Sequence, residues 1–242
     1  MIIEILKSIL RSVGLRIARY PTDDMKDLEK ILDEYHINLV LDVGANTGQY
    51  STYLRRSGYA KQIISFEPLK EEFQELIKSH SKDKNWRGFN LALGDFNGES
   101  LINHSKNSYS SSLLSAKESY KGNSFLTTGI NVYEKYTINV MRLDSFVKDN
   151  KIDLKVDTVA FLKIDVQGFE KKVLDGAIES LQFIKLIQLE MSIERVYEGG
   201  ILFDEMFDFL KLNGFKLIYV VPGFCNPKNG KMIEFDGVFA KG

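Results

Sequence analysis

Short apolar runs alternate with amphipathic stretches along most of the chain, and this alternation limits the possible folds most strongly. The apolar runs predict strands at residues 38–44, 62–68, 86–94, 158–168, 184–192, 215–223 and 231–242. Helical periodicity fills the intervening residues 49–58, 69–80, 169–181 and 203–214. Strands that alternate with helices form a mostly parallel sheet with helices on both faces. No helical pattern separates the last two runs, so they can pair only as an antiparallel hairpin. We therefore expect an α/β fold with a seven-stranded sheet that closes with this hairpin.

The two ends of this pattern and its middle define the expected domain organisation. Residues 1–37 form a predicted N-terminal helical segment, and residues 38–242 form one domain. Between about residues 95 and 155 the periodicity weakens, and Asn, Ser, Gly and Tyr become frequent. We interpret this part as an inserted loop or hairpin region over the sheet, where insertions commonly shape a substrate site.

The first residues of the chain carry an amphipathic pattern. Ile2, Leu6, Ile9 and Val13 fall on one helical face, and basic residues lie among them. The segment has neither the long apolar span of a membrane helix nor the cleavage site of a signal peptide. It can dock on its own domain or on a second subunit, or it can lie on an anionic membrane surface.

Composition excludes several classes of function. The 242 residues include 32 Lys and Arg against 33 Asp and Glu, a formal net charge of −1. Proteins that bind nucleic acid through charge are usually basic, so we expect no nucleic-acid partner. Cys225 is the single cysteine, which rules out an intramolecular disulfide or a cysteine-based zinc site and is typical of a reducing compartment. We expect a cytoplasmic protein, with weak contact to the inner face of the membrane through the N-terminal helix as a further possibility; the oligomeric state cannot be read from the sequence.

The stretch "DVGANTGQY" follows the first predicted strand and is typical of a nucleotide-binding turn. Gly44 can adopt a backbone conformation that other residues rarely take, and it leaves room for a ligand beside the backbone. Gly48 allows close passage into the next helix, and Asn46 and Thr47 can cap that helix. Helix N-termini favour anionic groups, so the turn suits a charged ligand.

The next strand ends in "SFEP", and this motif helps to choose between two cofactors. Glu67 is placed to accept hydrogen bonds from both hydroxyls of a ribose, as an acid does in dinucleotide enzymes. The G-x-G-x-x-G fingerprint is absent, however, and the pyrophosphate of NAD needs the missing glycine. S-adenosylmethionine carries no phosphate, and its demands are smaller. The terminal hairpin also favours the methyl donor. An NAD-linked oxidoreductase and a non-catalytic module that binds S-adenosylmethionine remain the alternatives.

The chain also resembles the FkbM-type methyltransferases, in "LDVGANTGQYS", "FEP", "NLALGD", "SSSLL", "RLDSF" and "LKIDVQGFEKKVLDGA". The resemblance covers about residues 38–242. It implies a class I methyltransferase Rossmann-like fold, S-adenosylmethionine as cofactor, and O-methylation of acceptors such as sugars and polyketide hydroxyls. Carried over to matching positions, it places Asp42, Gly44, Asn46, Gly48 and Tyr50 around the methionine end of the cofactor. It makes Glu67 the ribose acid with Phe66 and Pro68 shaping its turn, and it places Ala92 and Leu93 near adenine, where both can equally be plain strand core.

Two acids stand at the expected carboxyl ends of neighbouring strands and are the main catalytic candidates. Asp165 ends the fourth main strand and Glu190 ends the fifth, so both can border one cleft. Either can act as a general base on an acceptor hydroxyl. Together they could instead hold a divalent cation, but Ser192 is a poor third ligand and we favour chemistry without a metal. Asp165 can also bind the cofactor ammonium or cap the following helix, whereas Glu170 suits the first turn of that helix.

The inserted region supplies the candidates for recognising the acceptor. His104 can act as a base or contact a sugar. Tyr109, Ser111 and Ser112 offer hydroxyls that can line the acceptor site, although a surface loop would have a similar composition. The sequence thus predicts an S-adenosylmethionine-dependent O-methyltransferase that acts on a small-molecule or glycan hydroxyl.

Overall fold

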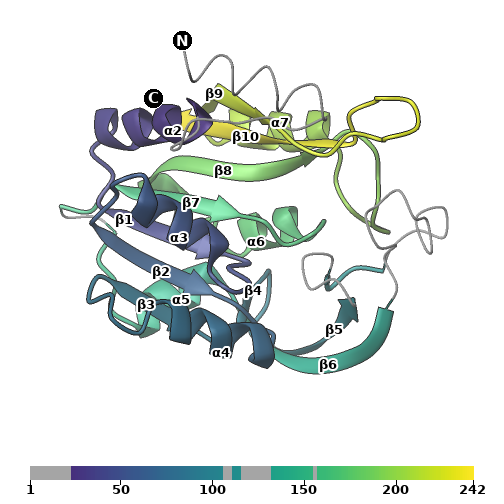
Figure 1. Ribbon diagram of the computed structural model, residues 1–242, viewed down its shortest axis with the longest axis horizontal. Coiled ribbons are helices and arrows are strands. Elements are labelled where there is room, and N and C mark those ends of the chain that lie inside the picture. Colours follow the sequence, from purple (N-terminus) through teal and green to yellow (C-terminus); the bar gives the residue numbers. More distant parts are fainter. Residues whose placement is uncertain (1–22, 106–110, 116–131, 155–156) are drawn as a thin grey trace, which may run out of the picture.

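The structure, a computed structural model, describes residues 23–105, 111–115, 132–154 and 157–242, and its main feature is a seven-stranded sheet (Figure 1). The strands follow the order β3-β2-β1-β7-β8-β10-β9. Their bounds are β1 Leu39–Val43, β2 Gln62–Phe66, β3 Trp86–Phe89, β7 Ala160–Ile164, β8 Ile184–Ser192, β9 Phe215–Pro222 and β10 Glu234–Lys241. Strands β2, β1, β7 and β8 are parallel, and β10 is antiparallel to both β8 and β9. The predicted sheet and its terminal hairpin are confirmed, with β10 inserted between β8 and β9.

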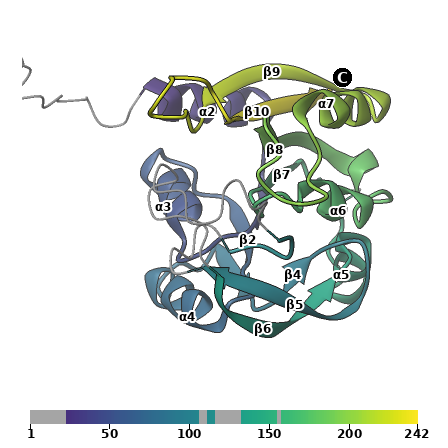
Figure 2. The same ribbon diagram turned by 90° about the vertical axis from the view of Figure 1, so that its right-hand side faces the viewer.

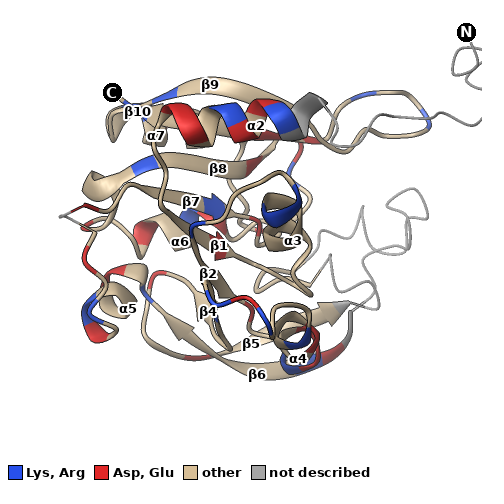
Figure 3. Ribbon diagram, turned by 60° about the vertical axis from the view of Figure 1, so that its left-hand side comes forward, with Lys and Arg blue, Asp and Glu red and all other residues tan. Residues whose placement is uncertain are grey.

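Helices cover both faces of this sheet (Figure 2). Helices α2 (Asp23–Glu34), α3 (Gln49–Arg56) and α4 (Lys70–Ser79) lie on one side. Helices α5 (Leu143–Asp149), α6 (Glu170–Asp175) and α7 (Phe203–Leu212) lie on the other, and a short 3₁₀ helix, η2 (Leu181–Phe183), precedes β8. Basic and acidic residues are interspersed along α2 and α4 (Figure 3), as the balanced composition leads one to expect.

The alternation of side chains along β1 and β7 divides the interior into two cores. Leu39, Leu41 and Val43 point into the core beneath α5, α6 and α7. Val40 points to the other side, where it packs with Leu32 of α2 and with the buried residues of α3. Because successive residues of a strand face opposite sides, Asp42 must point to the same side as Val40. This places a carboxylate on the face covered by α2 and α3.

The inserted region contains a small second sheet, with the order β4-β6-β5. Its strands are β4 (Ala92–Leu93), β5 (Gly98–Ser105) and β6 (Val132–Met141), and β5 and β6 form an antiparallel hairpin. The expected single strand over residues 86–94 is therefore wrong, because the chain turns between β3 and β4. Asn90 explains the turn, since its side-chain amide donates 2.9 Å hydrogen bonds to the carbonyls of Glu67 and Pro68.

Part of the predicted organisation falls outside the described residues. The amphipathic segment over residues 1–22 lies there, and so does the candidate acceptor residue Tyr109. Within the described residues, none of the helices combines the length and apolar character that crossing a membrane requires. Leu28 and Leu32 of α2 pack into the same core as Val40.

Candidate functional site

A row of buried polar side chains crosses the sheet on the face covered by α2 and α3. Ser65, Asp42, Lys163 and Gln188 occupy matched positions on β2, β1, β7 and β8. None is more than 6% exposed. Two residues earlier on the same face of β1, β7 and β8, the side chains are apolar and belong to the core. The face thus changes from apolar to polar near the carboxyl ends of the strands, where ligands bind in open α/β sheets.

Lys163 is the buried cation of this row. Its Nζ lies 3.6 Å from Oδ1 of Asp42 and 3.5 Å from Oδ2 of Asp165, and 5.0 Å from the centre of the Tyr50 ring. Burial lowers the pKa of Lys163, but the charges of Asp165, Asp42 and Asp236 outweigh it and raise the pKa above its ordinary value. The lysine therefore stays charged and links the first strand to the end of the fourth.

Asp42 is fully buried behind the nucleotide-type turn. Its Oδ2 accepts a 3.2 Å hydrogen bond from the Ser65 hydroxyl, while Oδ1 has no hydrogen-bond partner within the described part of the chain. Burial raises the pKa of Asp42, and the Lys163 ammonium opposes that shift. Asp42 therefore does not line the cavity itself. It lies behind the cavity and forms an ion pair with Lys163, which does line it.

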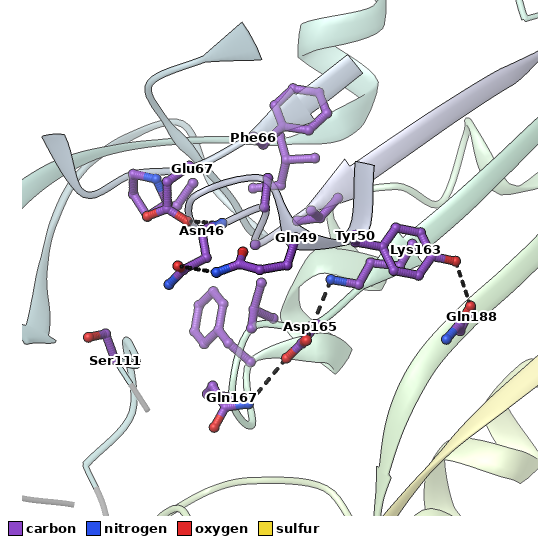
Figure 4. Close-up of a pocket in the computed structure, with 18 of the residues that line it drawn as sticks. Asn46, Gln49, Tyr50, Phe66, Glu67, Ser111, Lys163, Asp165, Gln167 and Gln188 are labelled. Carbon is purple, nitrogen blue, oxygen red and sulfur yellow. Dashed lines mark hydrogen bonds and ion pairs between the residues drawn. The ribbon is translucent and has the colours of Figure 1, made fainter. Parts of the chain in front are cut away.

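A cavity of about 440 Å³ lies above this polar row (Figure 4). Small-molecule sites commonly have volumes of roughly 300–1,000 Å³. The predicted site residues that line the cavity are Gly44, Asn46, Tyr50, Phe66, Glu67, Pro68, Ala92, Leu93, Ser111, Ser112 and Asp165. The structure therefore brings together residues from both sequence motifs and from the insertion.

The turn after β1 is shaped by its glycines and by contact with β7. Gly44 has φ +78°, and a Cβ atom there would lie 1.9 Å from the carbonyl oxygen of Asp165. A glycine is therefore needed at position 44 because the Asp165 backbone occupies the space of a side chain, and not only because a ligand needs room there. At Gly48, with φ +92°, a Cβ would lie 2.9 Å from Leu76, so this glycine permits α3 and α4 to pack closely.

The predicted cap of the first helix is corrected by the structure. Gly48 is the N-cap of α3, so no side chain caps the helix. The side chain of Asn46 instead accepts hydrogen bonds from the Thr47 N–H at 2.8 Å and from the Gln49 amide at 3.2 Å. The unsatisfied N–H groups at the start of an α-helix are a general site for anionic groups, and here they face the turn.

Glu67 lies at the other end of the turn, and both of its oxygens are engaged. Oε2 accepts the Asn46 N–H and Oε1 accepts the Leu69 N–H, each at 2.8 Å. Burial raises the pKa of Glu67 to about 7, against the effect of these two hydrogen bonds. Each carboxylate oxygen has two lone pairs, so Glu67 can still accept hydrogen bonds from a ligand in the cavity.

Asp165 and Gln167 form the opposite wall (Figure 4). The side chain of Asp165 is 47% exposed, and its Oδ1 accepts a 3.1 Å hydrogen bond from the Gln167 amide. Asp165 does not cap α6, whose N-cap is Phe169 and which has no side-chain cap. The N–H groups of Val166 and Gly168, just before the helix, are bound at 3.1 Å each by the carboxylate of Glu170. Asp165 is therefore free to face a ligand.

Glu190 lies beyond Gln167 and is not on the cavity wall that the described residues form. Its Oε2 accepts a 3.3 Å hydrogen bond from the Gln167 amide. Burial and the nearby acids, Glu234 first among them, raise the pKa of Glu190 well above its ordinary value, and burial raises that of Glu234 to about 7. Glu190 lies outside the cavity lining, so among the described residues it does not face an acceptor directly.

His104 is placed away from the cavity. It lies on β5, where its Nε2 is 3.9 Å from Oε1 of Glu72 on α4 and its ring contacts Tyr136. Ser112, by contrast, donates a 2.6 Å hydrogen bond to the Gln167 carbonyl. The position of His104 does not support the predicted role as a base, whereas Ser111 and Ser112 bring the insertion to the site.

The polar lining residues that sequence reasoning missed include Lys163, Gln167, Gln188 and Asp236. Tyr50 donates a 2.7 Å hydrogen bond to Oε1 of Gln188, and the Gln188 amide donates a 2.9 Å bond to Asp236. A signal existed for two of them, since Lys163 and Gln188 interrupt otherwise apolar strands. Among the described residues, no cluster of three or more His, Cys, Asp or Glu side chains could hold a metal ion.

Comparison with known proteins gives one family. A family model described as the methyltransferase FkbM domain matches residues 42–217. None of the curated proteins matches the chain.

Solved structures with a similar fold include three proteins of low sequence identity. A putative RNA methyltransferase from Pyrococcus horikoshii is 14% identical, with a TM-score of 0.46 and coverage of 95% of this chain and 89% of that one. An rRNA methylase from Streptococcus thermophilus is 11% identical, with a TM-score of 0.47 and coverage of 94% and 99%. Fibrillarin from Aeropyrum pernix, in complex with S-adenosyl-L-methionine, is 11% identical, with a TM-score of 0.46 and coverage of 84% and 66%. At these scores the likenesses carry no weight for substrate or mechanism.

Proposed function

This chain belongs to the FkbM family of methyltransferases, because the family model matches well over half of its length, and from that premise we propose that it methylates a hydroxyl group of a sugar, a glycan or a small natural product. The chain is an S-adenosylmethionine-dependent methyltransferase, and the acceptor is what the proposal adds. An NAD-linked oxidoreductase, one alternative left open by the turn after β1, is not what the family model describes.

The cavity fits S-adenosylmethionine on several counts. Glu67 retains lone pairs for the ribose hydroxyls, and the carbon-rich surfaces of Phe66, Ala92 and Leu93 suit a flat adenine ring. The N-terminus of α3 suits the carboxylate of the methionine portion. Asp42 and Lys163 support this end from below.

The observation that carries the proposal is the half-exposed carboxylate of Asp165 on the cavity wall. When bound, S-adenosylmethionine supplies a methyl group that is already activated on a sulfonium, so the enzyme's remaining work is to orient the acceptor and remove its proton. Asp165 accepts the proton of the acceptor hydroxyl as the oxygen forms its new bond to carbon. The Lys163 ammonium lies 3.5 Å from this carboxylate and forms an ion pair with it.

The charges around Asp165 favour an uncharged acceptor. Asp165 and Asp236 both line the cavity, and burial and the charge of Asp165 raise the pKa of Asp236. A phosphodiester would approach these acids at an electrostatic cost, which disfavours RNA as the substrate. A polyhydroxylated compound carries no such charge, and it can hydrogen-bond to the Gln167 and serine groups of the wall.

The test is methyl transfer from labelled S-adenosylmethionine to a panel of monosaccharides, oligosaccharides, phenols, amines, thiols and short RNA. We expect label only in hydroxyl compounds without phosphate. Transfer to RNA or to an amine would refute the proposed acceptor class. Tight binding of S-adenosylmethionine in calorimetry, without transfer to any compound, would favour the non-catalytic binding module.

A further inference from the structure

Gln167 has an unusual backbone conformation for a residue with a large side chain. Its φ of +56° lies in the left-handed region, which residues other than Gly, Asn and Asp rarely adopt. Gly168 follows with φ +93°, so two consecutive residues are held in this region. A conformation of this kind persists only where surrounding contacts enforce it, and it is a reason to look for function.

The surrounding contacts fix the orientation of the Gln167 side chain. The Tyr197 hydroxyl donates a 2.9 Å hydrogen bond to Oε1 of Gln167. Tyr197 packs against Gly168, where a Cβ atom would lie 2.8 Å from its ring. Burial raises the pKa of Tyr197 well above its ordinary value, so its hydroxyl remains a donor. The amide oxygen of Gln167 must therefore face Tyr197, and its NH₂ group must face the other way.

That NH₂ group bridges the two acids that the sequence singled out. One hydrogen is donated to Oδ1 of Asp165 at 3.1 Å, and the other to Oε2 of Glu190 at 3.3 Å. The backbone carbonyl of Gln167 also accepts the Ser112 hydroxyl. One residue thus contacts the half-exposed Asp165, the partly buried Glu190 and the inserted loop beside the cavity.

We propose that Gln167 is a positioning residue, which aims the Asp165 carboxylate at the acceptor and holds it apart from Glu190; this role rests on the proposed function. Without the amide, Asp165 loses the hydrogen bond to Oδ1 and keeps only Lys163 as its recorded side-chain partner among the described residues. The carboxyl groups of Asp165 and Glu190 can then share a proton directly, and Asp165 is no longer available to accept the hydroxyl proton. The neutral amide supplies two donors and no charge, a combination that neither Glu nor Met provides.

The first test compares Gln167→Met with Gln182→Met, a control at an exposed glutamine whose side chain donates a local hydrogen bond to the Glu179 carbonyl. We expect turnover of Gln167→Met to fall roughly 10- to 100-fold, since misplacement of a reacting group by about 1 Å can cost about 10²-fold. The dissociation constant for S-adenosylmethionine should change less than about threefold, and the control should match the wild type. Unchanged turnover in Gln167→Met would overturn the proposal.

The second test uses Gln167→Glu and a pH series. The charged or titratable groups around the introduced carboxyl are Lys163, Asp165, Glu170, Glu190, Tyr197, Glu234 and Asp236. Acids dominate this set, so the new carboxyl stays protonated near pH 6 and keeps one O–H donor, whereas near pH 9 it ionises and repels Asp165. We expect turnover relative to wild type to fall at least about tenfold from pH 6 to pH 9 in Gln167→Glu, but to stay flat in Gln167→Met. The same pH-independent loss in both variants would indicate a purely structural role and would overturn the proposal.

A crystal structure of Gln167→Met with S-adenosylmethionine separates this proposal from the proposed function. If the wild type methylates no hydroxyl compound, the proposed function fails, and the crystal structure then decides about Gln167. An Asp165 carboxylate that has turned toward Glu190 would support the positioning role. An Asp165 carboxylate in its original place would overturn it.

Discussion

Replacement of Gly44 by alanine tests whether the turn after β1 is set by the protein's own backbone. The added Cβ would lie 1.9 Å from the Asp165 carbonyl oxygen, where contacts below 3.0 Å do not occur without movement. The turn or the end of β7 must therefore move by about 1 Å. Gly199→Ala is a matched control, because Gly199 has φ +76° and nothing within 4 Å of its Cβ position.

The expected magnitudes follow from this comparison. An alanine at positive φ costs about 1–2 kcal/mol, of which about 0.4–1 kcal/mol is returned by a less flexible unfolded chain. Both variants share that net cost. Gly44→Ala adds an overpacking cost of about 1–3 kcal/mol, and for a chain of this size each kcal/mol lowers Tm by about 2–4 °C. We expect a Tm decrease of roughly 2–18 °C for Gly44→Ala and at most about 6 °C for Gly199→Ala.

Two assays measure the effect: calorimetric unfolding without ligand, and titration with S-adenosylmethionine. The shifted turn should weaken binding of the methyl donor by at least about tenfold in Gly44→Ala, since it misplaces a wall of the cavity by about 1 Å. Gly199→Ala should bind like the wild type. Equal stability and equal affinity in the two variants would refute the steric reasoning, because a Cβ atom meets Asp165 and Val166 at position 44 and no atom within 4 Å at position 199.

Three further outcomes follow from the site. Asp165→Asn should lower turnover by about 10²–10⁴-fold, the usual range for loss of a general base, and should change the affinity for S-adenosylmethionine less than about threefold. Single-turnover kinetics and calorimetry measure the two quantities, and equal losses in turnover and affinity would make Asp165 a binding residue. Wild-type stability without ligand should fall as pH rises from 4.5 through about 7, because the folded-state pKa of Glu67 is raised to about 7. Glu67→Gln removes the contribution of Glu67 to this pH dependence. The difference in unfolding free energy between wild type and variant should therefore change by up to about 3 kcal/mol between pH 5 and pH 8, with the wild type favoured at the lower pH. Urea titrations of both proteins measure this difference, and they would show no change with pH if Glu67 had an ordinary pKa. Exhaustive chelation should leave turnover unchanged, since Asp165 already has the Lys163 ammonium at 3.5 Å, and activity that chelation removes and Mg²⁺ restores would contradict this.

Periodicity was sufficient to predict the main sheet because the information for it is local. Each strand is a short apolar run, and Gly44, Glu67 and Asp165 could be placed because they follow such runs directly. The same reasoning failed over residues 86–94, where the apolar pattern continues through a turn. That turn depends on hydrogen bonds from Asn90 to carbonyls more than twenty residues earlier, and a window of the sequence does not contain them.

The acceptor side of the site was harder to predict for the same reason. Gln167 looks like an ordinary loop residue in "KIDVQGFE", and its importance depends on Tyr197, Glu190 and Ser112, which come from three other parts of the chain. The sequence led us to expect Asp165 and Glu190 at one cleft, but only Asp165 lines the cavity, and the position of Glu190 beside Glu234 depends on the β8–β10 pairing. The sequence can indicate which acids lie near one another. The direction in which the pKa of each acid is shifted depends on its burial, which only the structure shows.

The donor and acceptor sides of the site are parts of one rigid backbone unit. The Asp165 N–H donates a 3.0 Å hydrogen bond to the Val43 carbonyl, and the Asp165 carbonyl occupies the space that a side chain at Gly44 would need. Lys163 adds a side-chain link between Asp42 and Asp165. The distance from the cofactor turn to the acid on β7 is therefore fixed by main-chain contacts that any acceptor must accommodate. We expect differences in acceptor choice to arise from the inserted region, which reaches this unit through the bond from Ser112 to Gln167. Exchange of residues 111–115 should consequently alter which hydroxyl compound is methylated while leaving affinity for S-adenosylmethionine within about threefold, and a parallel loss of donor binding would show that the insertion and the cofactor site are not separable in this way.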